Sequence, residues 1–378
     1  MINLSLFLFL TVLFLTFYSY FGYPISLQII CCLRNKQNIR EGIYPHVSLI
    51  ITAFNEEERI KEKLENSLKL IYPPNKLQIL LASDGSNDKT NEIALSFSEQ
   101  GVELLEMKER GGKENAQKEA VAHARGDIFV FTDVATILEP NALCEIVSNF
   151  ADPTVGCVSS EDRLIGQNGK PSGEGIYVRY EMWLRRLESR VNSLVGLSGS
   201  FFAARKEVCN DFSGKVQSDF RTLLNSIKLG LRGVSDPHSV GYYLDLSDEK
   251  REVERKIRTV VRGLTVFWEH TEFLNPFRYG LFSYQYFCHK LLRWLIPFFL
   301  IIILITNINL AFNSLLFQLL LCGQIVFYSL GIYGWMTQRS KGFLKVPMFF
   351  FIVNAAIFIA WFKYIKGERI ILWTPSQR

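Results

Sequence analysis

Two long stretches of this sequence contain no charged side chain, and they constrain the fold more than any other feature. The first stretch covers residues 1–33 and the second covers residues 295–336. An apolar stretch of about 18 residues or more is a candidate transmembrane helix. The residues between the two stretches are charged throughout. The sequence therefore predicts a soluble domain with membrane helices on both sides.

The composition agrees with this organisation and excludes several classes of protein. A hydrophobic fraction of 48% with 30 Phe is too apolar for an ordinary soluble enzyme. The net charge is only +5, and the basic residues are spread along the chain, so nucleic acid is not an expected partner. The seven cysteines are odd in number and show no paired spacing, which indicates a reducing cytosolic face and neither disulfides nor zinc.

The N-terminal stretch lacks the positive start and the cleavage site of a signal peptide, so residues 1–33 are predicted to be a retained membrane anchor. Gly22-Tyr23-Pro24 is the expected exit of this anchor from the membrane. Arg34, Lys36 and Arg40 follow it, and the positive-inside rule then places the next domain in the cytoplasm. In a bacterial cell this predicts a multi-pass protein of the inner (cytoplasmic) membrane.

The C-terminal third is predicted to return to the membrane. Apolar and aromatic residues alternate with basic ones over residues 275–291, which is typical of a helix in the membrane interface. A transmembrane region at 292–365 and a tail at 366–378 follow, with candidate spans at 292–312, 315–336 and 346–362. Asn354 interrupts the last one, and a full crossing would place the basic tail outside. We therefore expect this segment to enter the membrane without crossing it.

Between the membrane regions, three apolar runs end abruptly in polar residues. The run at 47–51 leads into Thr-Ala-Phe-Asn-Glu-Glu, the run at 77–81 into Ala-Ser-Asp-Gly-Ser-Asn-Asp, and the run at 128–131 into Thr-Asp-Val-Ala-Thr. Buried parallel strands have such runs, and open parallel sheets bind ligands just beyond the carboxyl ends of their strands. Asn55, Glu56, Asp84 and Asp133 are therefore predicted to meet at one site.

The segments between these runs predict helices. Ile60, Leu64 and Leu68 recur every four residues, a further strand is expected at 102–105, and a helix at 113–124 follows Arg110-Gly111-Gly112. Alternation of strands and helices with short connections predicts an α/β, doubly wound sheet. After Asp133 the pattern changes to a strand at 155–159, a polar loop at 161–175, a long helix, a strand at 197–205, a helix opened by Ser218 and a basic helix at 255–263.

With these blocks in place, the chain resembles the family 2 glycosyltransferases, membrane-bound bacterial enzymes related to polysaccharide synthases. The resemblance covers about residues 44–263 and extends to the membrane helices. It depends on an ordered set of motifs: Thr-Ala-Phe-Asn-Glu-Glu, Ser-Asp-Gly-Ser-Asn-Asp-Lys-Thr, Gly-Gly-Lys, Phe-Thr-Asp, an Asp near a helix start, and an Arg-rich helix. It implies a GT-A fold with a Rossmann-like catalytic domain at residues 44–270.

The resemblance also implies roles for individual residues. Asp133 matches the first aspartate of the D-x-D motif, which holds the donor diphosphate through a divalent metal (Mg or Mn), and Asp219 matches the catalytic base. The nucleotide sugar is expected to contact Ala53, Asn55, Glu56, Asp84, Lys113, Asp133, Arg255 and Arg258.

The sequence departs from the family pattern at three positions. Ala135 replaces the second aspartate of D-x-D, which removes one possible metal ligand, although magnesium accepts few protein ligands when phosphates supply the others. Ser218 stands where the synthases carry an acidic residue before the base. Thr259 stands where they carry Trp, which weakens the case for processive synthesis.

Each candidate residue also has an ordinary structural interpretation. Asp84 suits a turn, and Asn55, Glu56 and Asp219 suit helix caps. Lys113 could be a solvated lysine, but a cation at a helix N-terminus is unfavourable unless an anion binds there. Arg255 and Arg258 suit anionic lipid head groups as well as a diphosphate.

The resulting hypothesis is a membrane-anchored inverting glycosyltransferase. It would transfer a sugar from a nucleotide-sugar donor to a lipid-linked or growing glycan acceptor, next to membrane lipids. One alternative is a polyprenyl-phosphate glycosyltransferase that charges a lipid carrier with one sugar. Another is a catalytically silent partner in glycan assembly.

Overall fold

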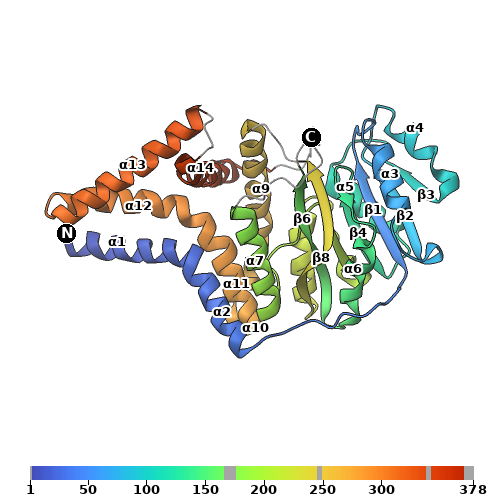
Figure 1. The fold of residues 1–378 in the computed structure, drawn as a ribbon, viewed down its shortest axis with the longest axis horizontal. Helices are drawn as coiled ribbons and strands as arrows, with labels where there is room; N and C mark the ends of the chain where they lie inside the picture. Colours follow the sequence, from blue (N-terminus) through green and yellow to red (C-terminus); the bar gives the residue numbers. More distant parts are fainter. Residues whose placement is uncertain (1, 166–175, 245–248, 338–341, 370–378) are drawn as a thin grey trace. The chain divides into compact units, whose positions relative to one another are not determined.

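The computed structural model of the 378-residue chain describes residues 2–165, 176–244, 249–337 and 342–369. The chain divides into two compact units. One unit comprises Met1–Ile29 and Leu246–Arg369, and the other comprises Ile30–Asp245 and Ile370–Arg378. The first holds the long apolar helices and the second holds the sheet (Figure 1).

The sheet has the strand order β3-β2-β1-β4-β7-β6-β8-β5. Its strands are β1 (Val47–Ala53), β2 (Leu77–Ser83), β3 (Val102–Glu106), β4 (Ile128–Asp133), β5 (Ile137–Leu138), β6 (Val155–Ile165), β7 (Phe201–Arg205) and β8 (Arg232–Leu244). The first four strands pair in parallel, as expected for buried runs joined by helical crossovers. The predicted α/β architecture is confirmed for this half.

The second half of the sheet is mixed. β7 runs antiparallel to both β4 and β6, whereas β8 runs parallel to β6 and pairs along nearly its whole length. The polar loop predicted at 161–175 was wrong in its first part, because Glu161 to Ile165 pair with Val240 to Leu244 and extend β6. Its remainder lies outside the described residues. The strand predicted at 197–205 begins only at Phe201, and the small residues before it form a loop.

Helices cover both faces of the sheet. They are α3 (Ile60–Leu68), α4 (Thr90–Leu95), α5 (Lys113–His123), α6 (Ala142–Ser148), α7 (Ile176–Val191) and α8 (Ser218–Lys228). On one face α3, α4 and α6 supply the buried residues Ile60, Ala94 and Leu143. On the other face α5 and α8 supply Ala116 and Leu223. The central strands are therefore buried on both sides, and only their ends are open to a ligand.

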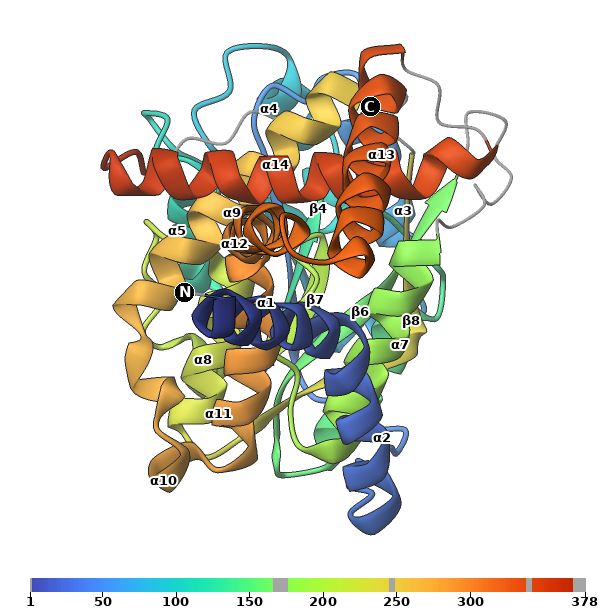
Figure 2. The ribbon, with the colours of Figure 1, turned by 90° about the vertical axis from the view of Figure 1, so that its left-hand side faces the viewer.

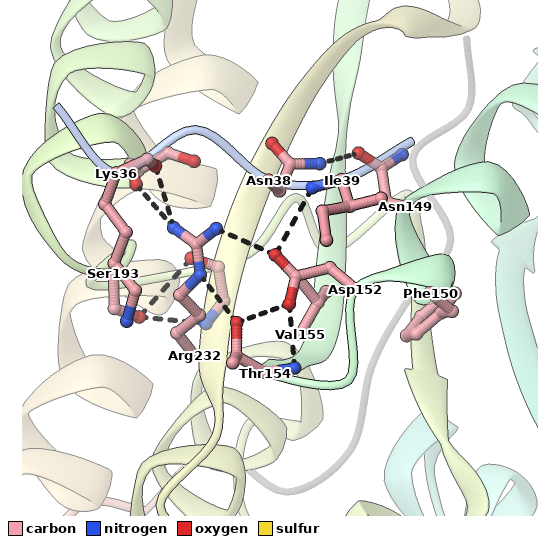
Figure 3. A network of polar contacts seen from close by, with 12 residues as sticks. Lys36, Asn38, Ile39, Asn149, Phe150, Asp152, Thr154, Val155, Ser193 and Arg232 are labelled. Atoms are coloured by element: carbon pink, nitrogen blue, oxygen red, sulfur yellow. Dashed lines mark hydrogen bonds and ion pairs between the residues drawn. The ribbon is translucent and has the colours of Figure 1, made fainter. Parts of the chain in front are cut away.

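A short linker segment, residues 36–40, is hydrogen-bonded to this domain (Figure 3). Arg232 on β8 donates to the Lys36 carbonyl at 3.1 Å and forms a buried ion pair of 3.3 Å with Asp152. The Ile39 N–H donates to Asp152 Oδ2 at 3.3 Å, and Asn38 donates to Asn149 at 2.6 Å. The segment therefore belongs to the domain, although the predicted boundary at residue 44 leaves it out.

The other unit is helical. Its helices are α1 (Ile2–Phe17), a π-turn (Tyr18–Gly22), α2 (Tyr23–Leu33), α9 (Glu249–Glu269), α10 (Pro276–Tyr279), α11 (Leu281–Tyr286), a second π-turn (Phe287–Leu292), α12 (Arg293–Ala311), α13 (Leu315–Thr337) and α14 (Lys345–Ile365). Helix α2 continues into the sheet-containing unit at Ile30. The basic helix is longer than the predicted 255–263.

The N-terminal helix continues through Gly22-Tyr23-Pro24 by way of the π-turn, and the exit from the membrane at these residues stays a prediction. One predicted boundary in this unit was wrong. The predicted interfacial helix at 275–291 is broken at Gly280, which has a φ of +54°. After Gly280 one helix continues from Leu281 to Ala311.

In the part of the chain that the structure describes, four helices are long and apolar enough to cross a membrane: Asn3–Leu33, Leu281–Ala311, Leu315–Thr337 and Lys345–Ile365. Helices α1 and α12 pack together through a small core of Phe9, Val12, Ile303 and Leu310. Figure 2 shows α1 and α12 nearly end-on, with α14 running across the view. The apolar helices predicted at both ends of the chain are therefore present.

Candidate active site

The carboxyl ends of β1, β2 and β4 meet at one edge of the sheet, as the sequence predicts. Each strand is longer than its apolar run, so Ala53 and Asp133 are the last residues of β1 and β4. In the register, Thr52 of β1 lies beside Asp133 and Ala53 lies beside Ser83. Asp84 follows Ser83 directly, and its N–H donates to the Ala53 carbonyl at 2.9 Å. The predicted residues Ala53, Asp84 and Asp133 are therefore neighbours.

Asp84 organises the turn that precedes α5. Its carboxylate accepts hydrogen bonds from the N–H groups of Gly111 and Gly112 at 2.8–3.0 Å, and the residue is 1% exposed. Burial raises the pKa of Asp84, while the two N–H groups and Arg110 oppose the rise. Gly112 has a φ of +93°, which favours glycine. Asp84 thus holds the Gly-Gly turn that sets the position of Lys113.

Asn55 and Glu56 form the loop after β1. Asn55 takes a left-handed φ of +52°, and its side-chain oxygen accepts from the Asn87 N–H at 3.0 Å. Glu56 is 3% exposed and pairs with Arg59 at 2.6 Å. Burial raises the pKa of Glu56, and the carboxylate of Asp133 adds to the rise, while Arg59 opposes it. The loops after β1 and β2 are therefore bonded to each other rather than being simple helix caps.

Lys113 joins this edge to the loop before β7. Its Nζ lies 2.5 Å from Asp133 Oδ1 and donates to the Gly199 carbonyl at 2.9 Å. The Asp133 N–H donates to the Ser200 carbonyl at 3.0 Å. The Asp133 side chain keeps an exposed fraction of 23%. This ion pair lies at a strand end and is partly exposed. It therefore suits a ligand that carries both a phosphate, for Lys113, and a metal ion, for Asp133.

Asp219 lies beside the same loop. It is in the first turn of α8, is 9% exposed, and accepts from Gln217 Nε2 at 3.1 Å. A Cβ atom added to Gly199 would lie 3.3 Å from Asp219 Oδ2. Gly199 is therefore next to both Lys113 and Asp219, and the structure brings the predicted metal ligand and the predicted base to one loop.

Arg255 and Arg258 lie on α9, which belongs to the helical unit. Burial lowers the pKa of Arg258, and the neighbouring Arg255 lowers it further. Their contact with the donor remains a prediction.

The residues at the site fit a divalent metal that is bound largely by its substrate. Within the described ranges, no group of three or more His, Cys, Asp or Glu side chains is placed to hold a metal ion by itself. Asp133 offers one partly exposed carboxylate, and Ala135 offers none. Mg²⁺ is commonly bound by one or two carboxylates together with substrate phosphates and water, which suits this arrangement.

The sequence interpretation missed two features of the site. Asp162 accepts hydrogen bonds from the hydroxyls of Ser198 and Ser200, at 2.7 Å and 3.1 Å, and so supports the Gly199 loop. In the sequence, Ser198, Gly199 and Ser200 show no pattern other than small side chains. Lys63 is completely buried next to the strand that ends in Asp133, and its spacing from Ile60 and Leu64 was a signal. Lys63 and Leu64 follow Ile60 by three and four residues, which places both on the helix face of Ile60.

Residues 48–212 match the model of glycosyl transferase family 2. The poly-beta-1,6-N-acetyl-D-glucosamine synthase of Staphylococcus aureus (strain COL) is 27% identical over 208 residues, which are 53% of this chain and 50% of that protein. The Staphylococcus epidermidis synthase of the same name is 25% identical over 170 residues, 44% of this chain and 40% of that protein. The chain thus matches about half the length of these curated relatives.

A solved structure extends the likeness beyond the matched segment. The mannosyltransferase from Pyrobaculum calidifontis, solved with GDP-Man and Mn²⁺, has a TM-score of 0.75 at 21% identity, and the match covers 96% of this chain and 99% of that one. At this identity the likeness concerns the fold, which is the GT-A fold expected from the motifs.

Proposed function

Because residues 48–212 form a domain of glycosyl transferase family 2, we propose that this protein transfers a sugar from a nucleotide-sugar donor to an acceptor hydroxyl, with inversion at the anomeric carbon. The observation that supports this most is the Gly199 loop. Its Gly199 carbonyl accepts from Lys113, the ion-pair partner of Asp133, and a Cβ atom on Gly199 would lie 3.3 Å from Asp219 Oδ2. Such a transfer needs an anion-binding group and a proton acceptor on opposite sides of one reacting carbon.

Asp133 and Lys113 form the donor side of the site. Asp133 would hold a divalent cation, which when bound neutralises charge on the diphosphate of the donor. The Lys113 ammonium, now 2.5 Å from Asp133, is placed to exchange this carboxylate for a phosphate oxygen. Ala53, Asn55, Glu56 and Asp84 would line the nucleotide pocket, since they form the loops at the ends of β1 and β2.

Asp219 forms the acceptor side. Its carboxylate would take the proton from the acceptor hydroxyl as that oxygen attacks the anomeric carbon, while the departing nucleoside diphosphate leaves toward Lys113. The Gln217 amide, 3.1 Å from Asp219 Oδ2, helps fix the carboxylate. Because Asp219 is 9% exposed, little water competes for it.

The acceptor is proposed to be a lipid-linked or growing glycan at the cytoplasmic leaflet. The four apolar helices supply membrane anchorage, and the curated relatives are named as synthases of poly-beta-1,6-N-acetyl-D-glucosamine. This likeness favours polysaccharide synthesis over the charging of a polyprenyl phosphate. The presence of both Asp133 and Asp219 at the matching motif positions argues against a catalytically silent partner.

The test is transfer by the purified full chain in lipid nanodiscs, with UDP- and GDP-sugars, Mn²⁺ or Mg²⁺, and lipid extracts as acceptor. We expect release of nucleoside diphosphate that EDTA abolishes, and a product seen by mass spectrometry of the lipid-linked glycans. Asp133→Ala should lose most transfer and most diphosphate binding while the protein still folds. Full activity of the wild type in EDTA would show the metal role to be wrong, and no turnover with any donor would favour the silent partner.

A further inference from the structure

Lys63 is a buried cation that the proposed chemistry does not use. It lies on α3, and its side chain has no exposed surface at all. Residues 60, 63, 64 and 67 are the buried face of this helix, so Lys63 occupies a position that would ordinarily be apolar. Burying an ammonium group is unfavourable unless other groups compensate for its lost hydration.

The contacts of Lys63 lie on both sides of Asp133. The Nζ atom donates to Thr132 Oγ1 at 3.0 Å and to the Thr136 carbonyl at 2.6 Å. The Thr136 N–H in turn donates to the Asp133 carbonyl at 3.1 Å, which closes the turn. One ammonium group therefore fixes the residue before the predicted metal ligand and the residue three positions after it.

Besides the two hydrogen bonds, the carboxylate of Asp133 supports the charge of Lys63 through space. Among the described residues no carboxylate accepts a hydrogen bond from Lys63, and the acidic group that supports its charged form is Asp133. Burial lowers the pKa of Lys63 to about 7, and Asp133 only partly opposes this. An apolar side chain of similar length would avoid the burial cost, since replacing buried charges by apolar residues is often neutral or stabilising. A charge kept at such a position indicates a functional requirement.

We propose that Lys63 is a positioning residue of the donor site, which holds the turn 132–136 so that the Asp133 carboxylate faces the metal-bound diphosphate. This inference depends on the proposed function, because it assigns Lys63 to the same site. Lys63 touches neither donor nor acceptor in this assignment. It acts through the Thr132 hydroxyl and the Thr136 carbonyl, while the Ser200 carbonyl accepts from the Asp133 N–H.

The test compares Lys63→Met with Lys61→Met, an exposed lysine on the same helix. The readouts are the melting temperature without ligand and the Mn²⁺ concentration needed for half-maximal binding of GDP or UDP. Residues that orient a metal ligand typically contribute ~10- to 100-fold to metal affinity. We expect Lys63→Met to need that much more Mn²⁺ while melting at or above the wild-type temperature, and Lys61→Met to match the wild type in both.

Thr132→Val is the second variant, because it removes one of the two acceptors without changing the shape of the side chain. It should shift the Mn²⁺ requirement in the same direction and by less, even if Lys63→Met does not fold. An unchanged Mn²⁺ requirement in the folded Lys63 and Thr132 variants would overturn the positioning role alone. A wild-type protein that binds neither nucleotide with Mn²⁺ would overturn both this inference and the proposed function.

Discussion

Asp219 and its neighbour Asp211 differ in ways that make a matched pair for mutagenesis. Asp219→Asn keeps the shape and the hydrogen bond to Gln217 but removes the proton acceptor. General-base help is typically worth ~10²- to 10⁴-fold in rate. We therefore expect Asp219→Asn to lose about that much transfer while binding nucleotide nearly as well as the wild type, measured by steady-state kinetics and nucleotide titration.

Asp211 is the control for this prediction. Its side chain is 79% exposed and pairs with Arg221 at 2.8 Å, and a surface ion pair contributes little to stability. Asp211→Asn should therefore keep transfer and folding. If Asp219→Asn kept its rate, or Asp211→Asn lost as much, the base would have to be sought among other acidic residues such as Glu161 and Asp162.

Gly199 should be sensitive to the smallest possible change. An added methyl group would lie 3.3 Å from Asp219 Oδ2, closer than most real contacts, and the Gly199 carbonyl also accepts from Lys113. We expect Gly199→Ala to reduce transfer by about tenfold or more, since small displacements of catalytic groups are costly. Gly101→Ala is unsuitable as a control because of its φ of +95°, whereas Gly323→Ala, with open space around it, should have no effect.

At the residue scale, the strand-end carboxylates were predictable because a polar residue directly after a buried apolar run lies at the ligand-binding edge of a parallel sheet. The convergence of Ala53, Asp84 and Asp133 followed from parallel strand geometry alone. The role of Gly199 could not be predicted in this way, since it depends on how a loop 66 residues after Asp133 returns to that residue. The Asp84 contact with the Gly-Gly turn likewise depends on packing between segments distant in sequence.

The ion pair between Arg232 and Asp152 joins the start of β8 to the turn before β6. Its side chains are only 4% and 8% exposed, and removing one member would leave the other buried without its charged partner. We expect Arg232→Leu to lower the free energy of unfolding by about 3–5 kcal/mol. Arg125→Leu, which breaks a largely exposed pair with Glu103, should cost about 1 kcal/mol or less. Melting temperatures in one detergent would compare them, and equal losses would contradict the prediction.

The same pair predicts a direction for acid sensitivity. Burial alone would raise the pKa of Asp152, but hydrogen bonds from Thr154 and Arg232 outweigh it and hold the pKa below its ordinary value of 3.8. A carboxyl with a depressed pKa stabilises the fold above its unfolded pKa and loses this contribution as the pH falls through the folded value. Asp152→Asn should therefore flatten the fall in melting temperature below about pH 4, and an unchanged slope would contradict it.

At the element scale, the sequence located the first four strands and α3, α5 and α8, because their apolar residues follow a clear period. The predicted strands were mostly one or two residues shorter than the observed ones. The residues at the strand ends, such as Ala, Ser, Thr and Asp, break the apolar run but still pair with the neighbouring strand. The sequence interpretation also missed β8, which contains Asp236, Pro237 and His238 and so lacks a strand pattern. The pairing of β8 with β6 overrides that local composition.

Helix α14 contacts α9, α12 and α13 of its own unit in different ways. Lys256 lies over the ring of Phe349, and Trp268 meets Trp361, so α9 and α14 run side by side over the same length of chain. By contrast, the described contacts with α13 involve the first turns of α14 near Pro347 and Met348. Those with α12 involve its last turns, where Trp361 donates to the Trp294 carbonyl at 2.9 Å. Helix α14 therefore crosses α12 and α13, in agreement with Figures 1 and 2.

This arrangement supports the expectation that α14 enters the membrane without crossing it. A partner helix as charged as α9 does not suit the hydrocarbon core, and basic residues flank α14 at both ends. Spin labels on cysteines at the exposed positions Val346 and Phe362 should report similar depths, although the two positions are about 24 Å apart along a helix.

The control is α13, with labels at Leu316 and Met336, which are also exposed. These two labels should lie near opposite surfaces of the bilayer, because α13 is expected to span it. Opposite depths for Val346 and Phe362 would show α14 to be a full span and would place the C-terminal tail outside. The length and composition of α14 alone satisfy the requirement for a span, so the sequence could not decide this point without the helix contacts.

The linker segment 36–40 bears on how such a domain can be exchanged between proteins during evolution or by grafting. A recombination point at residue 44 looks neutral in the sequence, but it would discard the Lys36 carbonyl that accepts from Arg232 and the Ile39 N–H that donates to Asp152. The segment that has to be transferred as one unit therefore begins earlier, close to the end of α2. A domain transferred with residues 34–43 of its own chain would keep these hydrogen bonds. A domain joined to a foreign membrane anchor at residue 44 would lack them, and Arg232 and Asp152 would each lose a hydrogen-bond partner.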